Sequence, residues 1–193
     1  RLGMLNSGRE ILIIQISKNV GIKENEPSFL YTSSMHGDEL TGYVIMLRLI
    51  DDILHNYSTN NYVKNLVDNI DIWINPLANP DGTYAGGNNN VFGATRSNAN
   101  NIDLNRNYPD PQDGLHPDGN SFQPETMIFM GLADTVNFNL ASNLHTGSVV
   151  ANYPWDTWSN TPADLNWWEH VCNEYSDTCQ LNGNSNYFTD FNN

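Results

Sequence analysis

The chain alternates between two hydrophobic patterns, one typical of strands and one typical of helices. Apolar runs that indicate buried strands occupy 11–16, 29–35, 70–74, 140–144 and 149–153. Apolar residues recur at every third or fourth position, as in a helix that packs on one side, over 39–57, 124–132 and 162–176. This alternation predicts an α/β fold in which helices sandwich a mixed, mostly parallel twisted sheet.

The length of the chain predicts a single domain. Its 193 residues are enough for a substantial core but too few for two comfortable domains. No internal repeat and no linker interrupts the predicted elements. We therefore expect one domain over residues 1–193.

Acidic residues dominate the charge of the chain. Its formal net charge is -14 and its sequence pI is ≈ 4.3. Nucleic acids and anionic membrane surfaces would repel such a chain, so neither is an expected partner, whereas a cationic substrate is. No apolar run approaches the length that spans a bilayer. The sequence leaves the oligomeric state open.

The two cysteines, Cys172 and Cys179, lie in the last predicted helical segment. If that segment is one continuous helix, their separation of seven positions corresponds to a rise of roughly 10 Å, which is too far for a disulfide. A bridge requires the helix to end near Tyr175. Both readings stay open, so the cysteines do not indicate a cellular compartment.

A candidate metal site stands at a strand-to-helix junction. His36 and Glu39 lie three residues apart, directly after the predicted strand 29–35 and at the start of the next predicted helix. Their side chains project to the same side and can reach one ion. With the distant His145 they make a three-ligand set that leaves the fourth position of a zinc ion open to water, which indicates hydrolysis. The alternative is a solvated helix start in which Asp38 and Glu39 complement the helix dipole.

A second candidate site is the loop 103–109, which places an arginine and two amides where no core requires them. The guanidinium of Arg106 can take a carboxylate through two parallel hydrogen bonds, and the amide of Asn105 can add a third donor. Nearby Arg96 supplies another positive charge, which is useful where an oxyanion develops. The alternative is that the arginines form surface ion pairs with Asp103 or Asp110.

Taken together, these motifs resemble a known family. The segments 36–39 (His-Gly-Asp-Glu), 79–82 (Asn-Pro-Asp-Gly), 96–109 and 143–156 occur in the order found in zinc metallocarboxypeptidases. The chain is most similar to the subfamily that includes carboxypeptidases E, N, D and M. Four motifs in one order over most of the chain make the resemblance specific, and it implies the zinc carboxypeptidase fold and an exopeptidase that acts on peptide or protein C-termini.

The resemblance also implies a role for individual residues. His36, Glu39 and His145 would bind one Zn²⁺ ion. Asn105 and Arg106 would hold the free C-terminal carboxylate of the peptide. In each case the implied role agrees with the chemistry of the side chain.

Two further roles follow from the resemblance. Arg96 would polarise the carbonyl of the scissile bond. Asp156 matches the family position that faces the terminal side chain in members selective for Lys or Arg. An ordinary turn aspartate is the alternative for Asp156. The segment 79–82 is expected to be a turn that supports the site without touching substrate.

One departure from the family limits the resemblance. Members use a glutamate as general base and a tyrosine that closes over the substrate, both in the C-terminal part of the catalytic domain. Neither Glu169 nor Glu174 fits the glutamate by context, and the surroundings of Tyr187 match the loop upstream of the tyrosine. We therefore expect the chain to correspond to the middle of a larger domain, incomplete at both ends.

Two other functions remain as alternatives. A zinc-dependent deacylase of N-acyl amino acids would use similar ligands and a similar arginine, and a non-catalytic zinc- or peptide-binding fragment would explain the unmatched glutamate. The remaining histidines, His55, His116 and His170, are expected to be structural or solvated. A metallocarboxypeptidase that is secreted or periplasmic is the favoured interpretation.

Overall fold

The computed structural model describes residues 1–22, 24–155, 159–188 and 190–192. These residues form two compact units, 1–146 and 147–193, which are described separately. In the described part of the chain, no helix is both long and apolar enough to cross a membrane.

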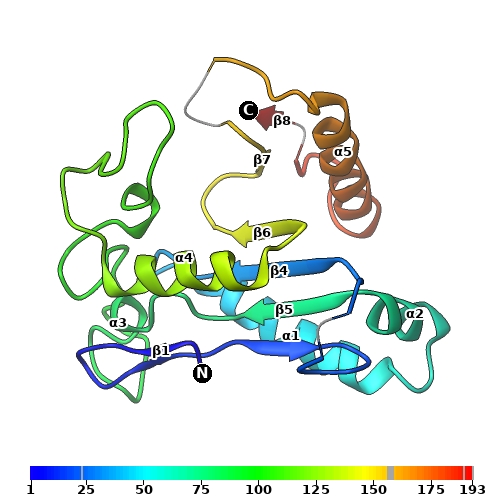
Figure 1. Cartoon of the computed structure of the whole chain (residues 1–193), viewed down its shortest axis with the longest axis horizontal. Helices are drawn as coiled ribbons and strands as arrows, with labels where there is room; N and C mark the ends of the chain where they lie inside the picture. Colours follow the sequence, from blue (N-terminus) through cyan, green and yellow to red (C-terminus); the bar gives the residue numbers. More distant parts are fainter. Residues whose placement is uncertain (23, 156–158, 189, 193) are drawn as a thin grey trace. The chain divides into compact units, whose positions relative to one another are not determined.

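The first unit is built on a mixed four-stranded sheet with the order β3-β5-β4-β6 (Figure 1). Its strands are β3 (Ile14–Ile16), β4 (Ser28–Ser33), β5 (Asp71–Asn75) and β6 (Leu140–Leu144). β4 runs parallel to both β5 and β6, whereas β3 is antiparallel to β5. The predicted mixed, mostly parallel sheet is confirmed.

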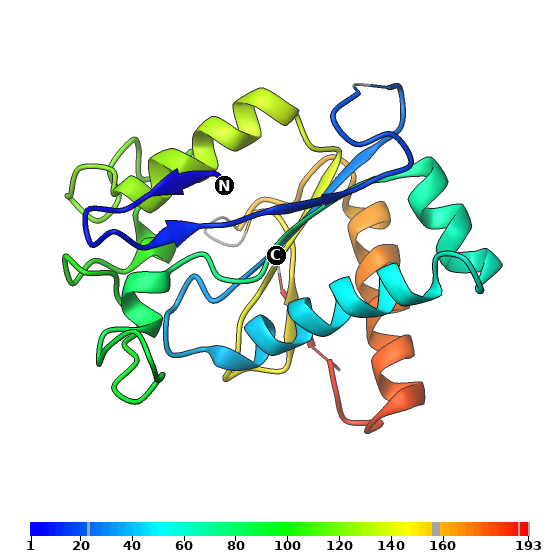
Figure 2. The same ribbon diagram turned by 90° about the horizontal axis from the view of Figure 1, so that it is seen from below.

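Helices cover both faces of this sheet (Figure 2). α4 (Pro124–Val136) lies on one face, while α1 (Leu40–Asn56) and α2 (Asn61–Asn69) lie on the other. Between the sheet and α1 and α2 lies a core of aliphatic side chains and one methionine: Ile16, Met46, Ile50, Ile53, Val67, Ile72 and Ile74. The core fixes the strands whose carboxyl ends carry the candidate site.

The sequence prediction differs from the structure at the strand 11–16 and at α2. The expected strand 11–16 is divided into β2 (Glu10–Ile11), which pairs with β1 (Gly3–Met4), and β3. The division falls where the Asn75 side chain donates a hydrogen bond to the Leu12 carbonyl, 2.7 Å away, in place of a strand neighbour. α2 was not predicted, although the Asn60 side chain caps it by accepting from the N–H groups of Tyr62 and Val63.

The second unit contains β7 (Val150–Asn152), α5 (Leu165–Asn182) and β8 (Asp190–Asn192), with β7 and β8 paired in parallel. α5 is longer than the predicted 162–176 and passes through Tyr175 without ending there. Cys172 and Cys179 therefore lie on one helix, and both are free. Asp156, the predicted specificity residue, lies outside the described residues.

Candidate active site

The three predicted zinc ligands meet at one edge of the first unit's sheet. His36 follows β4, Glu39 immediately precedes α1, and His145 follows β6. β4 and β6 are parallel neighbours with Ser33 opposite Leu144, so the two histidine-bearing loops leave the sheet at the same edge. Parallel pairing is thus what brings residues so distant in sequence together.

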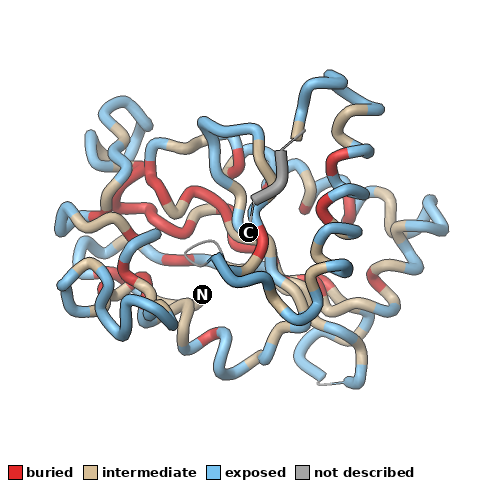
Figure 3. The backbone as a smooth tube through the Cα atoms, turned by 90° about the horizontal axis from the view of Figure 1, so that it is seen from above, coloured by how far each residue is buried: buried red, intermediate tan, exposed pale blue. Residues whose placement is uncertain are grey.

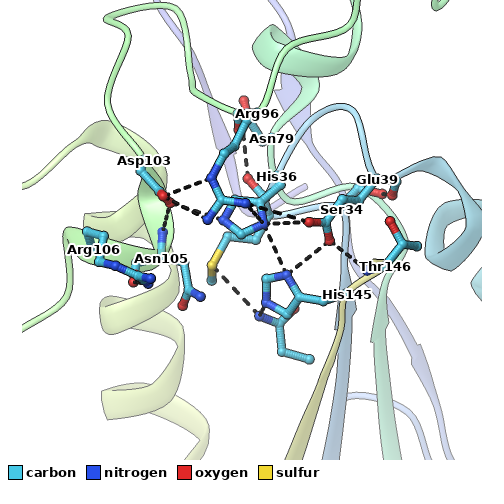
Figure 4. Close-up of polar contacts among 12 residues, drawn as sticks. Ser34, His36, Glu39, Asn79, Arg96, Asp103, Asn105, Arg106, His145 and Thr146 are labelled. Atoms are coloured by element: carbon cyan, nitrogen blue, oxygen red, sulfur yellow. Dashed lines mark hydrogen bonds and ion pairs between the residues drawn. The ribbon is translucent and has the colours of Figure 1, made fainter. Parts of the chain in front are cut away.

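The donor atoms of these side chains form a small triangle (Figure 4). Nδ1 of His36 lies 2.8 Å from Glu39 Oε1 and 3.1 Å from His145 Nδ1, and His145 Nδ1 lies 3.0 Å from Glu39 Oε2. In a tetrahedral zinc site with ligands at about 2.0–2.1 Å, neighbouring donors are about 3.3 Å apart. The triangle therefore fits one face of a zinc tetrahedron, and the donor set, two imidazoles and a carboxylate, is one that zinc prefers.

Asp103 prepares His36 for metal binding. Its Oδ1 lies 3.0 Å from His36 Nε2. Burial alone would raise the pKa of the Asp103 carboxyl, but hydrogen bonds from Arg96, from the Asn105 N–H and with His36 outweigh it and hold the pKa below its usual range. An ionised carboxylate only accepts, so a neutral His36 carries its proton on Nε2 and turns a bare Nδ1 toward the other ligands.

Glu39 and His145 also have the net charges that a metal requires of its ligands. Burial would raise the pKa of Glu39, but the hydrogen bond from the Thr146 N–H at 2.8 Å and the contacts with His36 and His145 outweigh it, so the pKa is lowered. Burial lowers the pKa of His145, and the charges of His36 and Arg96 add to this, while Glu39 opposes it. The site thus favours a carboxylate beside a neutral imidazole, which are the metal-binding forms.

Arg96 lies beside the donor triangle and also forms the ion pair that the sequence left as an alternative. Its Nε and Nη2 lie 3.0 and 2.9 Å from Asp103 Oδ2. Its Nη1 lies 3.1 Å from His36 Nδ1 and 3.8 Å from Glu39 Oε1. The guanidinium is therefore anchored at one end by Asp103, and its other end faces the donor triangle.

Asn105 and Arg106 stand on a short 3₁₀ turn, η1 (Leu104–Arg106), with exposed side chains. The turn is fixed from below by Leu104, which is buried, and capped by Asp103, whose Oδ1 accepts from the Asn105 N–H at 2.9 Å. Arg106 Nη1 donates to the Asn105 carbonyl at 2.9 Å, which leaves the rest of the guanidinium facing solvent. The same carboxylate, Asp103, thus positions a metal ligand, Arg96 and the turn.

The buried amide of Asn107 holds this loop onto α4. Its Oδ1 accepts from the Gln123 N–H at 2.7 Å and from Thr126 Oγ1 at 2.9 Å, and its Nδ2 donates to Asp118 Oδ2 and the Ser121 carbonyl at 3.0 and 3.2 Å. The residue is 1% exposed. All four hydrogen-bonding positions of the amide are therefore used.

We expect Asn107→Ala to lower the free energy of unfolding by about 3 kcal/mol, because it leaves several buried partners of the amide unpaired. Urea denaturation followed by circular dichroism measures the loss. Asn89→Ala, at an exposed position in a neighbouring loop, is the matched control and should change stability by less than about 0.5 kcal/mol. Equal effects of the two substitutions would contradict the assigned role.

The segment 79–82, predicted to be a turn, forms the N-terminal part of a short helix, α3 (Pro80–Thr83). Asn79 Oδ1 accepts from the Gly82 N–H at 2.8 Å, while Nδ2 donates to the carbonyls of Met35 and Arg96 at 3.2 and 3.4 Å. The ends of β4 and β5 and the residues of this segment are buried, among them Ser33, Asn75 and Asn79, and buried residues are red in Figure 3. The segment therefore supports the site from beneath, as the sequence predicted.

Sequence reasoning missed the supporting residues. Asp103 entered only as a possible ion-pair partner of an arginine, and Asn143 and Thr146, although part of a motif, were given no role. Asn143 and Thr146 flank His145 in the sequence, and that adjacency was the available signal. The contacts of Asp103 with His36 and of Thr146 with Glu39 follow only from the fold. The three histidines that were expected to be structural or solvated, His55, His116 and His170, are all exposed.

Comparison with known proteins identifies similar sequences. The family model described as zinc carboxypeptidase matches residues 2–192. Carboxypeptidase D of Rattus norvegicus is 39% identical over 174 residues, which cover 84% of this chain and 12% of that protein. The carboxypeptidase N catalytic chain of Homo sapiens is 33% identical over 177 residues, covering 80% of this chain and 39% of that protein. The chain thus spans well under half the length of these relatives.

Solved structures show the same fold. The carboxypeptidase A from Helicoverpa armigera aligns with a TM-score of 0.75 at 23% identity, covering 98% of this chain and 50% of that one. Thrombin activatable fibrinolysis inhibitor aligns with a TM-score of 0.83 at 15% identity, covering 97% and 51%. The fold that the motif resemblance implied is confirmed by these alignments.

Proposed function

The chain belongs to the zinc carboxypeptidase family, and from that premise we propose that it is a zinc-dependent exopeptidase that hydrolyses the last peptide bond and releases Lys or Arg. The observation that carries the proposal is the donor triangle of His36, Glu39 and His145, with Asp103 behind it. Zinc bound there would supply a Lewis acid that polarises a carbonyl and activates water at neutral pH.

The residues of the chain contribute binding and orientation. Arg106 and Asn105 donate hydrogen bonds to the free carboxylate of the peptide, which restricts cleavage to the terminal residue. Arg96, held by Asp103, offers Nη1 to the oxygen on which negative charge develops. Binding of the terminal carboxylate and stabilisation of the oxyanion thus come from one loop system fixed by one carboxylate.

The preference for a basic terminal residue rests on charge. A formal net charge of -14 attracts a cationic side chain and repels an acidic one. Asp156, which resembles the family's specificity position, would pair with the terminal Lys or Arg. A secreted or periplasmic location is the setting we propose for such an exopeptidase.

The decisive experiment compares three substrates with zinc-loaded protein in the longest form that its gene encodes. A peptide ending in Lys or Arg should lose that residue, as detected by mass spectrometry. The same peptide with its C-terminus amidated should stay intact. Cleavage of an N-acyl amino acid alone would favour the deacylase. Binding of zinc and peptide without cleavage of any substrate would favour a non-catalytic binding module, the reading suggested by the unmatched glutamate.

Substituting Arg106 should weaken substrate binding without disturbing the metal. We expect Arg106→Gln to lower kcat/KM by about 100-fold, equivalent to roughly 2.7 kcal/mol, because a charge-assisted bidentate contact is lost. Arg106→Lys should restore only part of the activity, since lysine cannot offer the planar pair of donors. Arg48→Gln, an exposed charge removal on α1, is the control. An Arg106→Gln variant with unchanged KM would contradict the clamp.

A further inference from the structure

The two metal-facing histidines are supported by different kinds of partner. His36 Nε2 faces a carboxylate, Asp103 Oδ1, at 3.0 Å, whereas His145 Nε2 faces an amide, Asn143 Nδ2, also at 3.0 Å. A carboxylate can only accept from a ring N–H, but an amide presents either a donor or an acceptor. The tautomer of His145 is therefore not fixed by its partner alone.

A second residue, Thr32, binds the other end of this amide. Thr32 on β4 is paired with Asn143 on β6 in the parallel ladder, and Thr32 Oγ1 donates to Asn143 Oδ1 at 2.9 Å. The amide NH₂ then points at His145 Nε2 and, at 3.7 Å, at Met35 Sδ. With a donor on Nε2, a neutral His145 carries its proton on Nδ1 and gives it to Glu39 Oε2, 3.0 Å away. This is the tautomer whose Nδ1 cannot coordinate a metal.

The opposite orientation also pairs Thr32, Asn143 and His145, and loses only the contact with Met35 Sδ. If the amide turns by 180°, Asn143 Oδ1 accepts from a protonated His145 Nε2, and Nδ2 donates to Thr32 Oγ1, because a hydroxyl both donates and accepts. The ring stays neutral: Nδ1 gives one proton to water and Nε2 takes one from water. The bare Nδ1 then joins the donor triangle.

We propose that Asn143, backed by Thr32, is a positioning residue that selects the tautomer of His145, and that its amide turns over when the site takes up its metal. The inference deepens the proposed function and rests on its zinc site. Asp103 presets one histidine permanently, while the Thr32 and Asn143 pair makes the second histidine convertible at no cost in unpaired polar groups.

Two measurements test this inference, zinc affinity by chelator competition and the tautomer of His145 by ¹⁵N NMR. Asn143→Leu, which removes the acceptor, should weaken zinc binding by about 10- to 100-fold. Asn143→Asp, which offers only an acceptor, should show Nε2–H in the metal-free protein, where the unaltered protein shows Nδ1–H. Zinc should convert the unaltered protein to Nε2–H.

Thr32 provides the matched pair of variants. Thr32→Ser keeps the hydroxyl and should leave the tautomer of His145 and the zinc affinity unchanged. Thr32→Val removes the hydroxyl and should change both. Unchanged affinity in Asn143→Leu, or Nδ1–H in metal-free Asn143→Asp, would overturn the inference. The metal-free tautomers of the unaltered protein and Asn143→Asp can be read even if neither binds zinc, so failure of the zinc proposal is recognised separately.

Discussion

His36→Ala is expected to abolish stoichiometric zinc retention and, with it, the proposed hydrolysis of the C-terminal residue. Apparent binding free energies at protein zinc sites of about 10–16 kcal/mol correspond to roughly 3–4 kcal/mol per ligand. Loss of one ligand should therefore weaken zinc binding by about 100- to 1000-fold. The substitution also leaves Asp103 and Arg96 without their shared histidine partner.

Metal analysis after dialysis against a weak chelator measures this prediction. The unaltered protein should keep one zinc per chain and His36→Ala none, and zinc should raise the thermal midpoint only of the unaltered protein, because a ligand that binds the folded state stabilises it. His55→Ala removes an exposed histidine from α1 and is the control. Full zinc content in His36→Ala would disprove the assigned ligand set.

Gly37→Ala should damage both stability and the site, since the glycine lies between the ligand loop and α3. A Cβ at this position would lie 2.4 Å from Gly82 C, 2.4 Å from Thr83 N and 2.6 Å from Thr95 O, all of them backbone atoms. Backbone cannot move aside as a flexible side chain can. We expect a loss of about 3 kcal/mol in the free energy of unfolding, in the upper range for overpacking.

Gly131→Ala on α4 is the control for this substitution. A Cβ there meets nothing within 4 Å, and alanine favours a helix over glycine, so this variant should be more stable by about 0.5–1 kcal/mol. Denaturant unfolding should thus show a lower free energy of unfolding for Gly37→Ala and a higher one for Gly131→Ala. Zinc affinity should fall in Gly37→Ala alone, because only that glycine adjoins a ligand. An unchanged free energy of unfolding in Gly37→Ala would contradict the close packing of backbone atoms around Gly37.

Much of the fold could be predicted because burial imposes a period on the sequence. The strand 140–144 was predicted with its observed bounds, and the helix beginning after Glu39 within about one residue, since their apolar residues face a core. α2 was missed because its nine residues bury a single valine and are held by a cap rather than a long apolar face. Strand 11–16 was misread because its division depends on a side chain from β5.

The candidate site divides in the same way. The chemistry of a side chain is set by its residue type, so His36, Glu39 and the loop 103–109 predict metal and carboxylate binding from the sequence alone. Asp103 and Asn143 act only through the histidines that they contact. Sequence spacing does not show that Nε2 of His36 and Nε2 of His145 face these two side chains. Residues that hold others in place are found only when distances are known.

The sequence by itself determined which side chains are available: an imidazole and carboxylate pair, a distant second imidazole and a loop with arginines and amides, on alternating strands and helices. The tertiary structure alone decided that the three ligands converge, because the parallel pairing of β4 and β6 brings their loops to one edge. It also decided which group faces the second ring nitrogen of His36, because Asp103 lies 67 residues away in the sequence and reaches the ring only through the fold.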